Sequence, residues 1–434
     1  MNSFLLYCRR LRLYDFFIIY YYLMSVPMCD FSDLKNRFWT PLYLYDAWEI
    51  RKNIRDYREY FKSSYFDTEV IYASKALNIK EMLRIVNEEW ISLDCVSVWE
   101  IYTALKVKFP VDKIYFHWNN KTYDDILFAL DNNILTFVVD NLWELELLKQ
   151  LTDEKRKDIN ILIRLNVGVS AHTHKYIVTA HVDSKFWVLY DSDDYIKMMD
   201  IINNSEYIQF LWFHSHIWSQ IFDLNAFKES LKKLFGYCKW FNQPLVLNLW
   251  WWFAVHYTDE DKPIPFTEIS KSLIEFTEEL ISENWVKIKK LCIEPWRSIV
   301  WEAWSTLYTI WYIKKTPGKE YYFIDGWMTD NIRPALYQAK YDADIVWKEH
   351  LPKNRIVTVA WKCCESWDLI LEDCNLQDAE QWDLLITYTT WAYWYSMSSN
   401  YNKIPAPAVV FIENWEVKLV VKRQTYDQLI EREE

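Results

Sequence analysis

Apolar strand-like runs alternate with helix-like stretches along most of this 434-residue chain. The first four runs begin 22 residues apart, at positions 69, 91, 113 and 135, and each is followed by an amphipathic stretch such as NIKEMLRIVNEE. Four further runs begin at positions 159, 208, 244 and 287. Repeated units of a strand followed by a helix are typical of a parallel barrel or a doubly wound sheet, and eight units favour the barrel.

The sequence pattern of alternating strand-like and helix-like stretches ends at residue 297. Short β-rich runs such as YYFID, IVTVAW and AVVFI are separated there by turn residues, which predicts an antiparallel β-barrel or sandwich. The strand-like segment PLYLYD at 41–46 could belong to the same domain. We therefore predict an α/β plus all-β protein, with a TIM-type (β/α)8 barrel at 48–297 and a β domain formed by 30–47 together with 298–434.

Residues 1–29 are predicted to be an N-terminal extension. The apolar run from Phe16 to Met28 is too short to span a bilayer. No small-residue cleavage site follows it, so an upstream start codon, with translation beginning at Met24 or Met28, is favoured over a signal peptide.

Charge and cysteine usage exclude several classes of function. The net charge of −12 disfavours binding to nucleic acid, and no membrane span is predicted. The 8 cysteines show neither the paired spacing of a zinc site nor a secreted disulfide framework. We expect a cytoplasmic protein without a metal site.

The glycine and tryptophan counts are both abnormal. Glycine appears 4 times and tryptophan 26 times, and 4 + 26 = 30, which is roughly the glycine count that ordinary usage of about 7% would give. Asn414-Trp415 lies between the β-rich runs VVFI and EVKLVV, where Asn-Gly would form a tight hairpin with positive φ at both residues. We therefore predict that the source organism decodes one codon, here translated as tryptophan, as glycine. If the tryptophans are literal, the chain is either a tryptophan-rich protein or a damaged barrel that binds nothing.

Reactive side chains occur at the carboxyl ends of the predicted barrel strands, where barrels place their active sites. Lys75 ends the first strand, in YASKAL, and poor solvation there would lower its pKa and allow a Schiff base with a carbonyl. A lone lysine at a strand end is more often solvated. Glu294, however, ends the eighth strand and could pair with a protonated pyridine nitrogen. Residues 250–252, if glycines, would offer backbone amides to a phosphate. Together these features describe a pyridoxal-phosphate site.

The chain resembles the barrel-type pyridoxal-phosphate decarboxylases, and most closely their diaminopimelate decarboxylase branch. The resemblance runs from about Thr40 to Asn414, when tryptophan is taken as glycine. The motifs that carry it, in chain order, are YASKAL, SLDCVSVWE, YFHWNNK, SKFW, FHSHIWSQ, LNLWWWF, EPWR, DGWMTDNIRPALYQA, CCESWD and WAYWYSMSSNYN.

The resemblance implies a set of site residues. Lys75 would hold pyridoxal 5'-phosphate as a Schiff base, Glu294 would pair with the pyridine nitrogen, and His216 would stack on the ring. The residues implied for the phosphate are Ser219, the amides of Trp250, Trp251 and Trp252, the turn Trp296-Arg297, and Tyr393. Those implied for the substrate are Arg297, Arg333, Tyr337, Glu365 and Tyr393. Cys364 is the implied acid that protonates the carbanion.

The implied reaction is decarboxylation of meso-2,6-diaminopimelate to L-lysine, the last step of lysine biosynthesis, by a homodimer with shared active sites. The alternative is a related decarboxylase for ornithine, arginine or carboxynorspermidine. Arg333 in RPALY favours a substrate that ends in a carboxylate, because a guanidinium binds a carboxylate with two hydrogen bonds. A non-catalytic barrel for cofactor homeostasis is disfavoured, since it would lack the β domain. The role of His214, in packing or in support of the site, stays open.

Overall fold

The computed structural model describes residues 29–167, 186–221, 224–239, 241, 243–253, 264–284, 286–389 and 394–434, but not the side chains of 216–221, 226 and 250–253. The predicted N-terminal extension lies outside these residues except for Cys29. The described chain forms two compact units. One spans Arg51–Val255 and Lys262–Ile299, and the other contains the residues up to Ile50 and Val300–Glu434. The domain borders predicted from the sequence stay a prediction.

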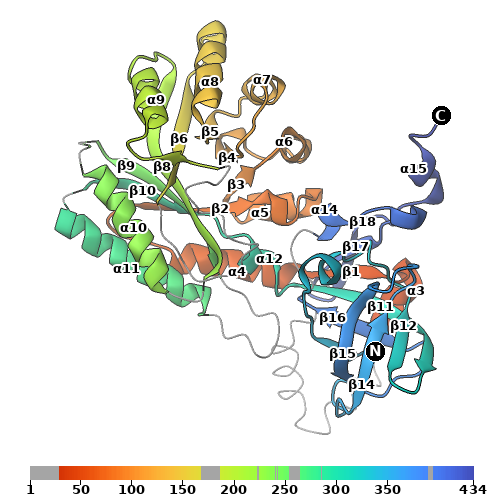
Figure 1. The fold of residues 1–434 in the computed structure, drawn as a ribbon. Coiled ribbons are helices and arrows are strands. Elements are labelled where there is room, and N and C mark those ends of the chain that lie inside the picture. Colours follow the sequence, from red (N-terminus) through yellow and green to blue (C-terminus); the bar gives the residue numbers. More distant parts are fainter. Residues whose placement is uncertain are drawn as a thin grey trace. The chain divides into compact units, whose positions relative to one another are not determined.

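The first unit is a closed parallel barrel, which confirms the predicted fold (Figure 1). Its eight strands pair in the order β5-β4-β3-β2-β10-β9-β8-β6, and β6 pairs back with β5. The strands are β2 (Asp67–Ala73), β3 (Ser92–Cys95), β4 (Ile114–Phe116), β5 (Thr136–Val139), β6 (Ile159–Asn166), β8 (Ile208–Ile221), β9 (Leu245–Phe253) and β10 (Ile288–Ile293). A short strand, β7 (Val188–Leu189), pairs with β6.

One helix precedes the first barrel strand and others follow the barrel strands, and they stand around the outside of the barrel in Figure 1. They are α4 (Ala47–Tyr60), α5 (Lys80–Glu88), α6 (Val98–Lys106), α7 (Tyr123–Asp131), α8 (Leu142–Lys155), α9 (Asp193–Asn203), α10 (Leu224–Cys238), α11 (Phe266–Asn284) and α12 (Arg297–Val300), with the 3-10 turns η1 (Ser74–Ala76) and η2 (Val111–Lys113). Several begin at a polar cap: Thr122 forms a capping box with Asp125 at α7, and the Asn141 side chain accepts from the Glu144 amide at α8. Such caps satisfy amides that have no partner within the helix.

Apolar side chains fill the barrel interior. Each comes from a different strand: Ile71, Tyr115, Val138, Leu162, Val246 and Cys292 form one buried cluster. Because side chains alternate across a strand, the same strands also present apolar residues to the surrounding helices. The interior is therefore a packed core, and polar side chains are left to gather at the strand ends.

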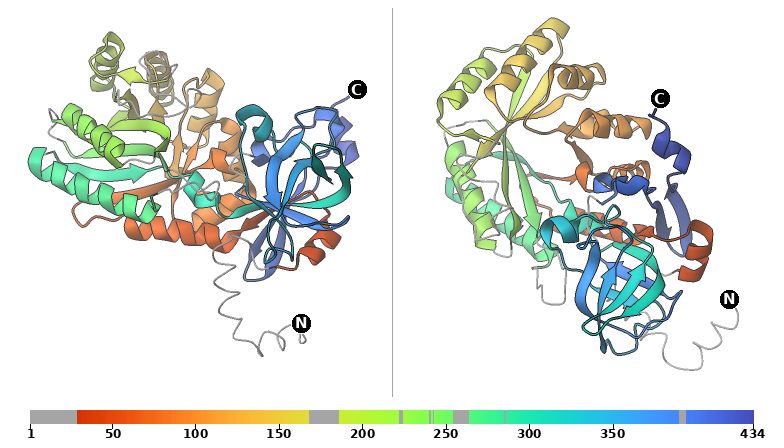
Figure 2. Two further views of the ribbon diagram at one scale, coloured as in Figure 1. Left: turned by 60° about the horizontal axis from the view of Figure 1, so that its bottom comes forward. Right: turned by 45° about the vertical axis from the view of Figure 1, so that its right-hand side comes forward.

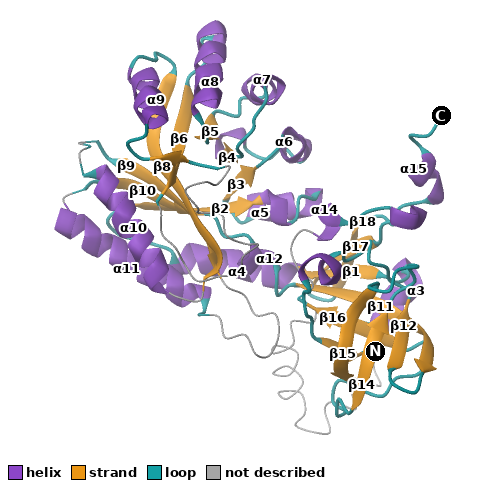
Figure 3. Ribbon diagram, in the orientation of Figure 1, coloured by secondary structure: helices purple, strands orange, loops and turns teal. Residues whose placement is uncertain are grey.

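The second unit is built on a nine-stranded sheet in the order β15-β14-β12-β11-β1-β17-β18, with β16 paired to both β11 and β13. Figure 3 shows these strands in orange, and both views of Figure 2 show the teal and blue ones side by side. The strands are β1 (Leu42–Asp46), β11 (Trp304–Lys315), β12 (Glu320–Ile324), β13 (Ala343–Ile345), β14 (Arg355–Ala360), β15 (Leu369–Leu376), β16 (Leu384–Tyr388), β17 (Ala408–Glu413) and β18 (Glu416–Val421).

The sheet is mostly antiparallel, as predicted, but two of its pairings are parallel: β1 with β17 and β12 with β14. The segment 41–46 does supply a strand of this sheet, since β1 lies between β11 and β17. Leu42, Leu44, Leu307, Ile386 and Val410 share one buried cluster across these strands. The short helices of this unit are α3 (Phe31–Phe38), α13 (Arg333–Tyr337), α14 (Trp394–Met397), α15 (Tyr426–Ile430) and the turn η3 (Tyr401–Lys403).

The predicted hairpin at Asn414-Trp415 is confirmed. Glu413 pairs with Glu416, so Asn414 and Trp415 form the whole loop between β17 and β18. Their φ angles are 50° and 70°, the left-handed conformation that a two-residue hairpin loop requires. Among the described residues, no helix is both long and apolar enough to cross a membrane.

Candidate functional site

Lys75 lies in η1, directly after β2, at the carboxyl end of the barrel. Its neighbour Ser74 is buried and donates a hydrogen bond to Glu100 Oε2 at 2.8 Å. The same oxygen accepts from the Val96 amide at 2.7 Å. Glu100 therefore joins the turn that carries Lys75 to the loop after β3, and this fixes the position of the lysine backbone.

The Lys75 amine lies among aromatic rings and charged side chains. Nζ is 5.9 Å from the ring centre of Trp118 and 5.7 Å from that of Trp296. Loss of hydration lowers the pKa of Lys75 to about 8, although Asp94 acts in the opposite direction. The amine is therefore neutral more often than a solvated lysine, as a nucleophile for a carbonyl must be.

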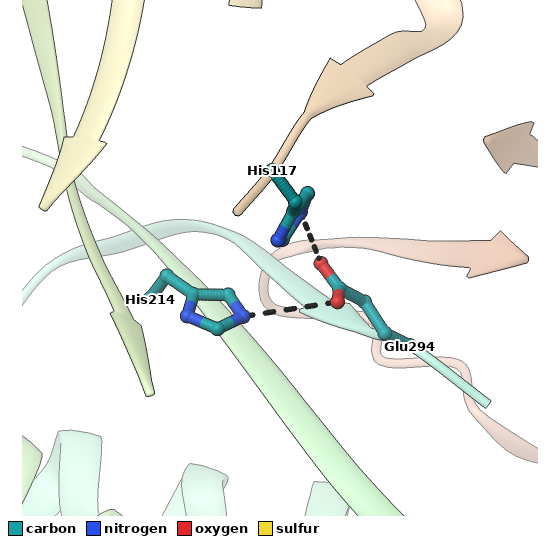
Figure 4. A group of neighbouring side chains, drawn as sticks. All are labelled: His117, His214 and Glu294. Carbon is teal, nitrogen blue, oxygen red and sulfur yellow. Dashed lines mark ion pairs between the residues drawn. The ribbon is translucent and has the colours of Figure 1, made fainter. Parts of the chain in front are cut away.

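Glu294 follows β10 and is completely buried. Its Oε1 accepts a hydrogen bond from Asn248 Nδ2 at 2.5 Å and lies 3.1 Å from His117 Nε2. Its Oε2 lies 3.7 Å from His214 Nε2 (Figure 4). Although burial acts to raise it, the two imidazoles hold the pKa of Glu294 below its usual range. The carboxylate is thus kept ionised inside the barrel.

The two imidazoles come from strands of the barrel that do not pair with each other. His117 follows β4 and His214 lies on β8, and their ring centres are 5.0 Å apart. Burial lowers the pKa of His214 to about 3, so this side chain is neutral at pH 7. The same side chain lies beside the Glu294 carboxylate, and its role in packing or in support of the site stays a prediction. The two imidazoles and Glu294 offer ligand atoms within 4.8 Å of one another, as a metal ion also would require. The absence of a metal stays a prediction.

Further charged groups surround this cluster. Asp94 on β3 is fully buried, with Oδ1 3.8 Å from His117 Nε2, and burial raises its pKa to about 7. Arg164 on β6 pairs with Asp140 at 3.4 Å, and its guanidinium lies 4.2 Å from the Trp187 ring centre. These strand ends therefore form a buried polar layer on top of the apolar barrel core.

Part of the predicted cofactor site is seen only as backbone. His216 and Ser219 lie on β8 and residues 250–252 on β9, and His216 is the register partner of Trp250. β10 pairs with β9 beside these residues, and directly after β10 the Glu294 amide donates to Leu249 O at 3.2 Å. The chain thus brings these segments side by side at one end of the barrel. The side chains of His216, Ser219 and 250–252, and the whole of Tyr393, lie outside the described residues.

The predicted turn at Trp296-Arg297 lies at the same end. Both residues are buried, and the Arg297 guanidinium is 4.3 Å from the Trp296 ring centre. Because Lys75 also contacts the Trp296 ring, the turn and the lysine share one environment. The role of the Trp296-Arg297 turn in phosphate binding stays a prediction.

The predicted substrate residues Arg333 and Tyr337 lie together in the β-sheet unit, on α13. Arg333 is buried, with its guanidinium 5.4 Å from the Tyr337 ring centre and Nη1 3.4 Å from Tyr341 Oη. Tyr337 is exposed. The guanidinium is therefore held by aromatic neighbours within this unit.

Cys364 and Glu365 lie in a loop of the same unit. Cys364 is exposed, and Glu365 Oε1 accepts a hydrogen bond from Tyr401 Oη at 2.8 Å. The loop is anchored by Asp368, which accepts from the Cys363 amide at 2.5 Å and from the Met328 amide at 2.9 Å. This carboxylate ties the CCESWD and DGWMTD segments together. The catalytic role of Cys364 and the substrate-binding role of Glu365 stay predictions.

Sequence reasoning missed the residues that support the main groups. Asp94 and Glu100 occur in the motif SLDCVSVWE, and Asn248 occurs in LNLWWWF. Their place in these motifs was the sequence signal that could have identified them. Ser97, also at a strand end, has a different role: its hydroxyl accepts from the Glu100 amide and caps α6. A polar residue at a barrel strand end can therefore begin the next helix and need not contact a ligand.

Comparison with known proteins gives a consistent result. Residues 48–301 match the family model of the pyridoxal-dependent decarboxylases, pyridoxal binding domain. Diaminopimelate decarboxylase of Bacillus subtilis is 42% identical over 413 residues, covering 94% of both chains, and that of Bacillus methanolicus is 43% identical, covering 92% of this chain and 94% of the relative.

A solved structure supports the same relationship. The crystal structure of diaminopimelate decarboxylase from M. jannaschii in complex with L-lysine superposes with a TM-score of 0.86 at 28% identity, covering 93% of this chain and 94% of that one. The predicted resemblance and the pyridoxal cofactor are confirmed by these matches. The chain therefore belongs to the pyridoxal-dependent decarboxylases, and within them to the diaminopimelate decarboxylase family.

Proposed function

We propose that this protein decarboxylates meso-2,6-diaminopimelate to L-lysine and carbon dioxide, the last step of lysine biosynthesis. The observation that carries the proposal is the 42% identity to a diaminopimelate decarboxylase along 94% of both chains. Such a match spans the barrel and the β-sheet unit together, so it includes the segments that a barrel acting alone would lack. The lysine bound to the M. jannaschii enzyme is the product that this reaction would release.

The described residues fit a pyridoxal ring at the end of the barrel. Glu294 Oε2 is buried and accepts no hydrogen bond from any described residue, whereas Oε1 is occupied by Asn248. A buried carboxylate oxygen without a donor is costly, and a protonated pyridine nitrogen would satisfy it. Lys75, with its lowered pKa, supplies the amine to which the aldehyde carbon binds.

When bound, pyridoxal phosphate accepts the electron pair that remains after carbon dioxide departs. Glu294 would hold the proton on the pyridine nitrogen, and Lys75 would bind the aldehyde carbon of the cofactor. His216 is the residue proposed to contact the face of the ring. The residues proposed to hold the phosphate are Ser219, the amides of 250–252, the turn Trp296-Arg297, and Tyr393.

The substrate's distal end carries both a carboxylate and an ammonium group. Arg333 supplies a buried guanidinium, which suits two parallel hydrogen bonds to the carboxylate. Arg297, Tyr337 and Tyr393 are the other residues proposed to bind the substrate. Glu365 binds the ammonium, and Cys364 donates the proton that replaces carbon dioxide. We further propose a cytoplasmic homodimer in which Cys364 and Glu365 serve the partner's site.

Substrate profiling tests the proposal. The purified protein, loaded with pyridoxal phosphate, is supplied separately with meso-diaminopimelate, ornithine, arginine and carboxynorspermidine, and carbon dioxide and amine products are measured. We expect lysine from meso-diaminopimelate at a far higher kcat/KM than any other product. A preference for ornithine would overturn the substrate assignment, and binding of the cofactor without any turnover would support a homeostasis barrel.

A further inference from the structure

The two oxygens of the Glu294 carboxylate have different surroundings. Oε1 accepts the short hydrogen bond from Asn248 Nδ2 and faces His117 at 3.1 Å. Oε2 lies 3.7 Å from His214 Nε2 and accepts no hydrogen bond from a described residue. The carboxylate is therefore held from one side, and its other oxygen stays available.

We propose that Asn248 is a positioning residue that aims Glu294 Oε2 at the pyridine nitrogen; this inference rests on the proposed function. Asn248 lies on β9, is fully buried, and is the register partner of Cys292, two residues before Glu294. A side-chain amide has no proton to lose near neutral pH, so its N–H donates to Oε1 whatever the protonation state of the neighbouring histidines. It therefore fixes the carboxylate and favours the ionised form.

Replacement of Asn248 separates this role from simple packing. Asn248→Leu keeps the number and branching of the side-chain heavy atoms and removes the donor, whereas Asn248→Gln keeps the amide. We expect the leucine variant to lower kcat about 10- to 100-fold, as loss of a group that orients a ligand does, with KM little changed. We also expect the pH titration of the bound cofactor's visible absorbance to shift, and the glutamine variant to recover part of both.

The matched control is Asn53→Leu, because Asn53 is also buried in this unit but donates to the backbone oxygen of Ile299 in α12 and not to Glu294. It should lower the melting temperature and leave the absorbance titration unchanged. If Asn248→Leu shows the wild-type titration and kcat, the positioning role is wrong. If the wild-type protein binds the cofactor but lacks decarboxylase activity, the proposed function fails while the titration still tests Asn248.

A second inference comes from the backbone, independently of the site. Eighteen described residues other than glycine have positive φ, and eight of them are tryptophans: Trp39, Trp90, Trp118, Trp187, Trp212, Trp347, Trp382 and Trp415. The described glycines Gly236, Gly318 and Gly326 have no such angle. A bulky side chain at positive φ is a genuine outlier, whereas glycine adopts it freely. The chain therefore has tryptophan where its fold needs glycine.

The φ values at Trp118 and Trp212 are the most demanding. They are 99° and 121°, well beyond the left-handed helical region near 57°, in a part of backbone space that is essentially restricted to glycine. Exposure points the same way, since Trp90 and Trp99 are 73% and 77% exposed although tryptophan is usually well buried. Neither observation depends on the glycine and tryptophan counts.

We infer that the source organism decodes as glycine the codon translated here as tryptophan. Trp118 and Trp296, whose rings now lie beside the Lys75 amine, would then leave that space to the cofactor. Residues 250–252 would present backbone amides without side chains. The inference concerns the covalent chain and holds whatever reaction the site performs.

Peptide mass spectrometry of the protein purified from its source organism tests this inference. We expect glycine in the peptides that contain positions 118, 212 and 415, and tryptophan there would overturn it. As a second measurement, two synthetic genes that encode all 26 positions as tryptophan or as glycine are expressed in a standard bacterium. The glycine chain should resist urea better and bind pyridoxal phosphate more tightly; equal or poorer behaviour would contradict the inference.

Discussion

The substitution Trp415→Gly should stabilise the protein that has tryptophan at position 415. Trp415 is the second residue of the two-residue β17–β18 loop, with φ at 70°. Relief of a bulky residue from this conformation contributes about 1–3 kcal/mol. The greater freedom of glycine in the unfolded chain subtracts about 0.5–1 kcal/mol.

Loss of apolar burial contributes little at this position. The Trp415 side chain keeps 65% of its extended-chain exposure, and unfolded chains already bury about 10–40% of that surface. The net gain in the free energy of unfolding is therefore about 1 kcal/mol, which would raise the melting temperature by about 2–4 °C for a unit of this size.

Trp99→Gly is the matched control, because Trp99 is 77% exposed but lies within α6. Trp99 is the second residue of α6, so glycine there should lower stability by less than the about 1 kcal/mol of a helix interior, and the two substitutions should have opposite signs. Thermal and urea unfolding, followed by circular dichroism, measure both variants. If Trp415→Gly destabilises the protein as much as Trp99→Gly does, the argument from backbone strain is wrong.

Four further predictions concern the site. Lys75→Ala should abolish the visible absorbance of the lysine-bound cofactor with an unchanged circular dichroism spectrum; a retained band with normal turnover would reject the role of Lys75. The rate at which the apo-protein captures pyridoxal phosphate should rise with pH, half-maximal near pH 8, because only the neutral Lys75 amine reacts. Burial lowers the pKa of this amine, and Arg164 acts in the same direction, while Asp94, Glu100 and Glu294 oppose the shift without cancelling it; a midpoint near 10.5, as for a solvated lysine, would contradict this. Arg333→Met should raise KM for meso-diaminopimelate about 10- to 100-fold through loss of a charged hydrogen-bond pair, while KM for a substrate without the distal carboxylate stays unchanged. Mixing inactive Lys75→Ala and Cys364→Ala proteins should restore about a quarter of wild-type activity if each site draws on both subunits, and no recovery after subunit exchange would exclude shared sites.

Much of the architecture could be predicted because it depends on local patterns. Apolar runs of strand length, each followed by an amphipathic stretch, predict the barrel, and the polar residues that end those runs include Lys75 and Glu294. In a closed parallel barrel all carboxyl ends meet on one side, so residues more than two hundred positions apart are brought together by topology alone. The Asn414-Trp415 hairpin was equally predictable, since a two-residue loop requires positive φ.

Other features depend on which segments meet in space. Neither the parallel pairing of β1 with β17 nor that of β12 with β14 follows from the alternation within any one strand. The bond from Asn248 to Glu294 and the link from Ser74 to Glu100 join residues of ordinary type from different strands or loops. Ser97 also follows a barrel strand, β3, but its hydroxyl caps a helix. Hydrophobic periodicity is a property of the chain, whereas the partner of a buried polar group is decided only when burial removes water and leaves the nearest side chain to replace it.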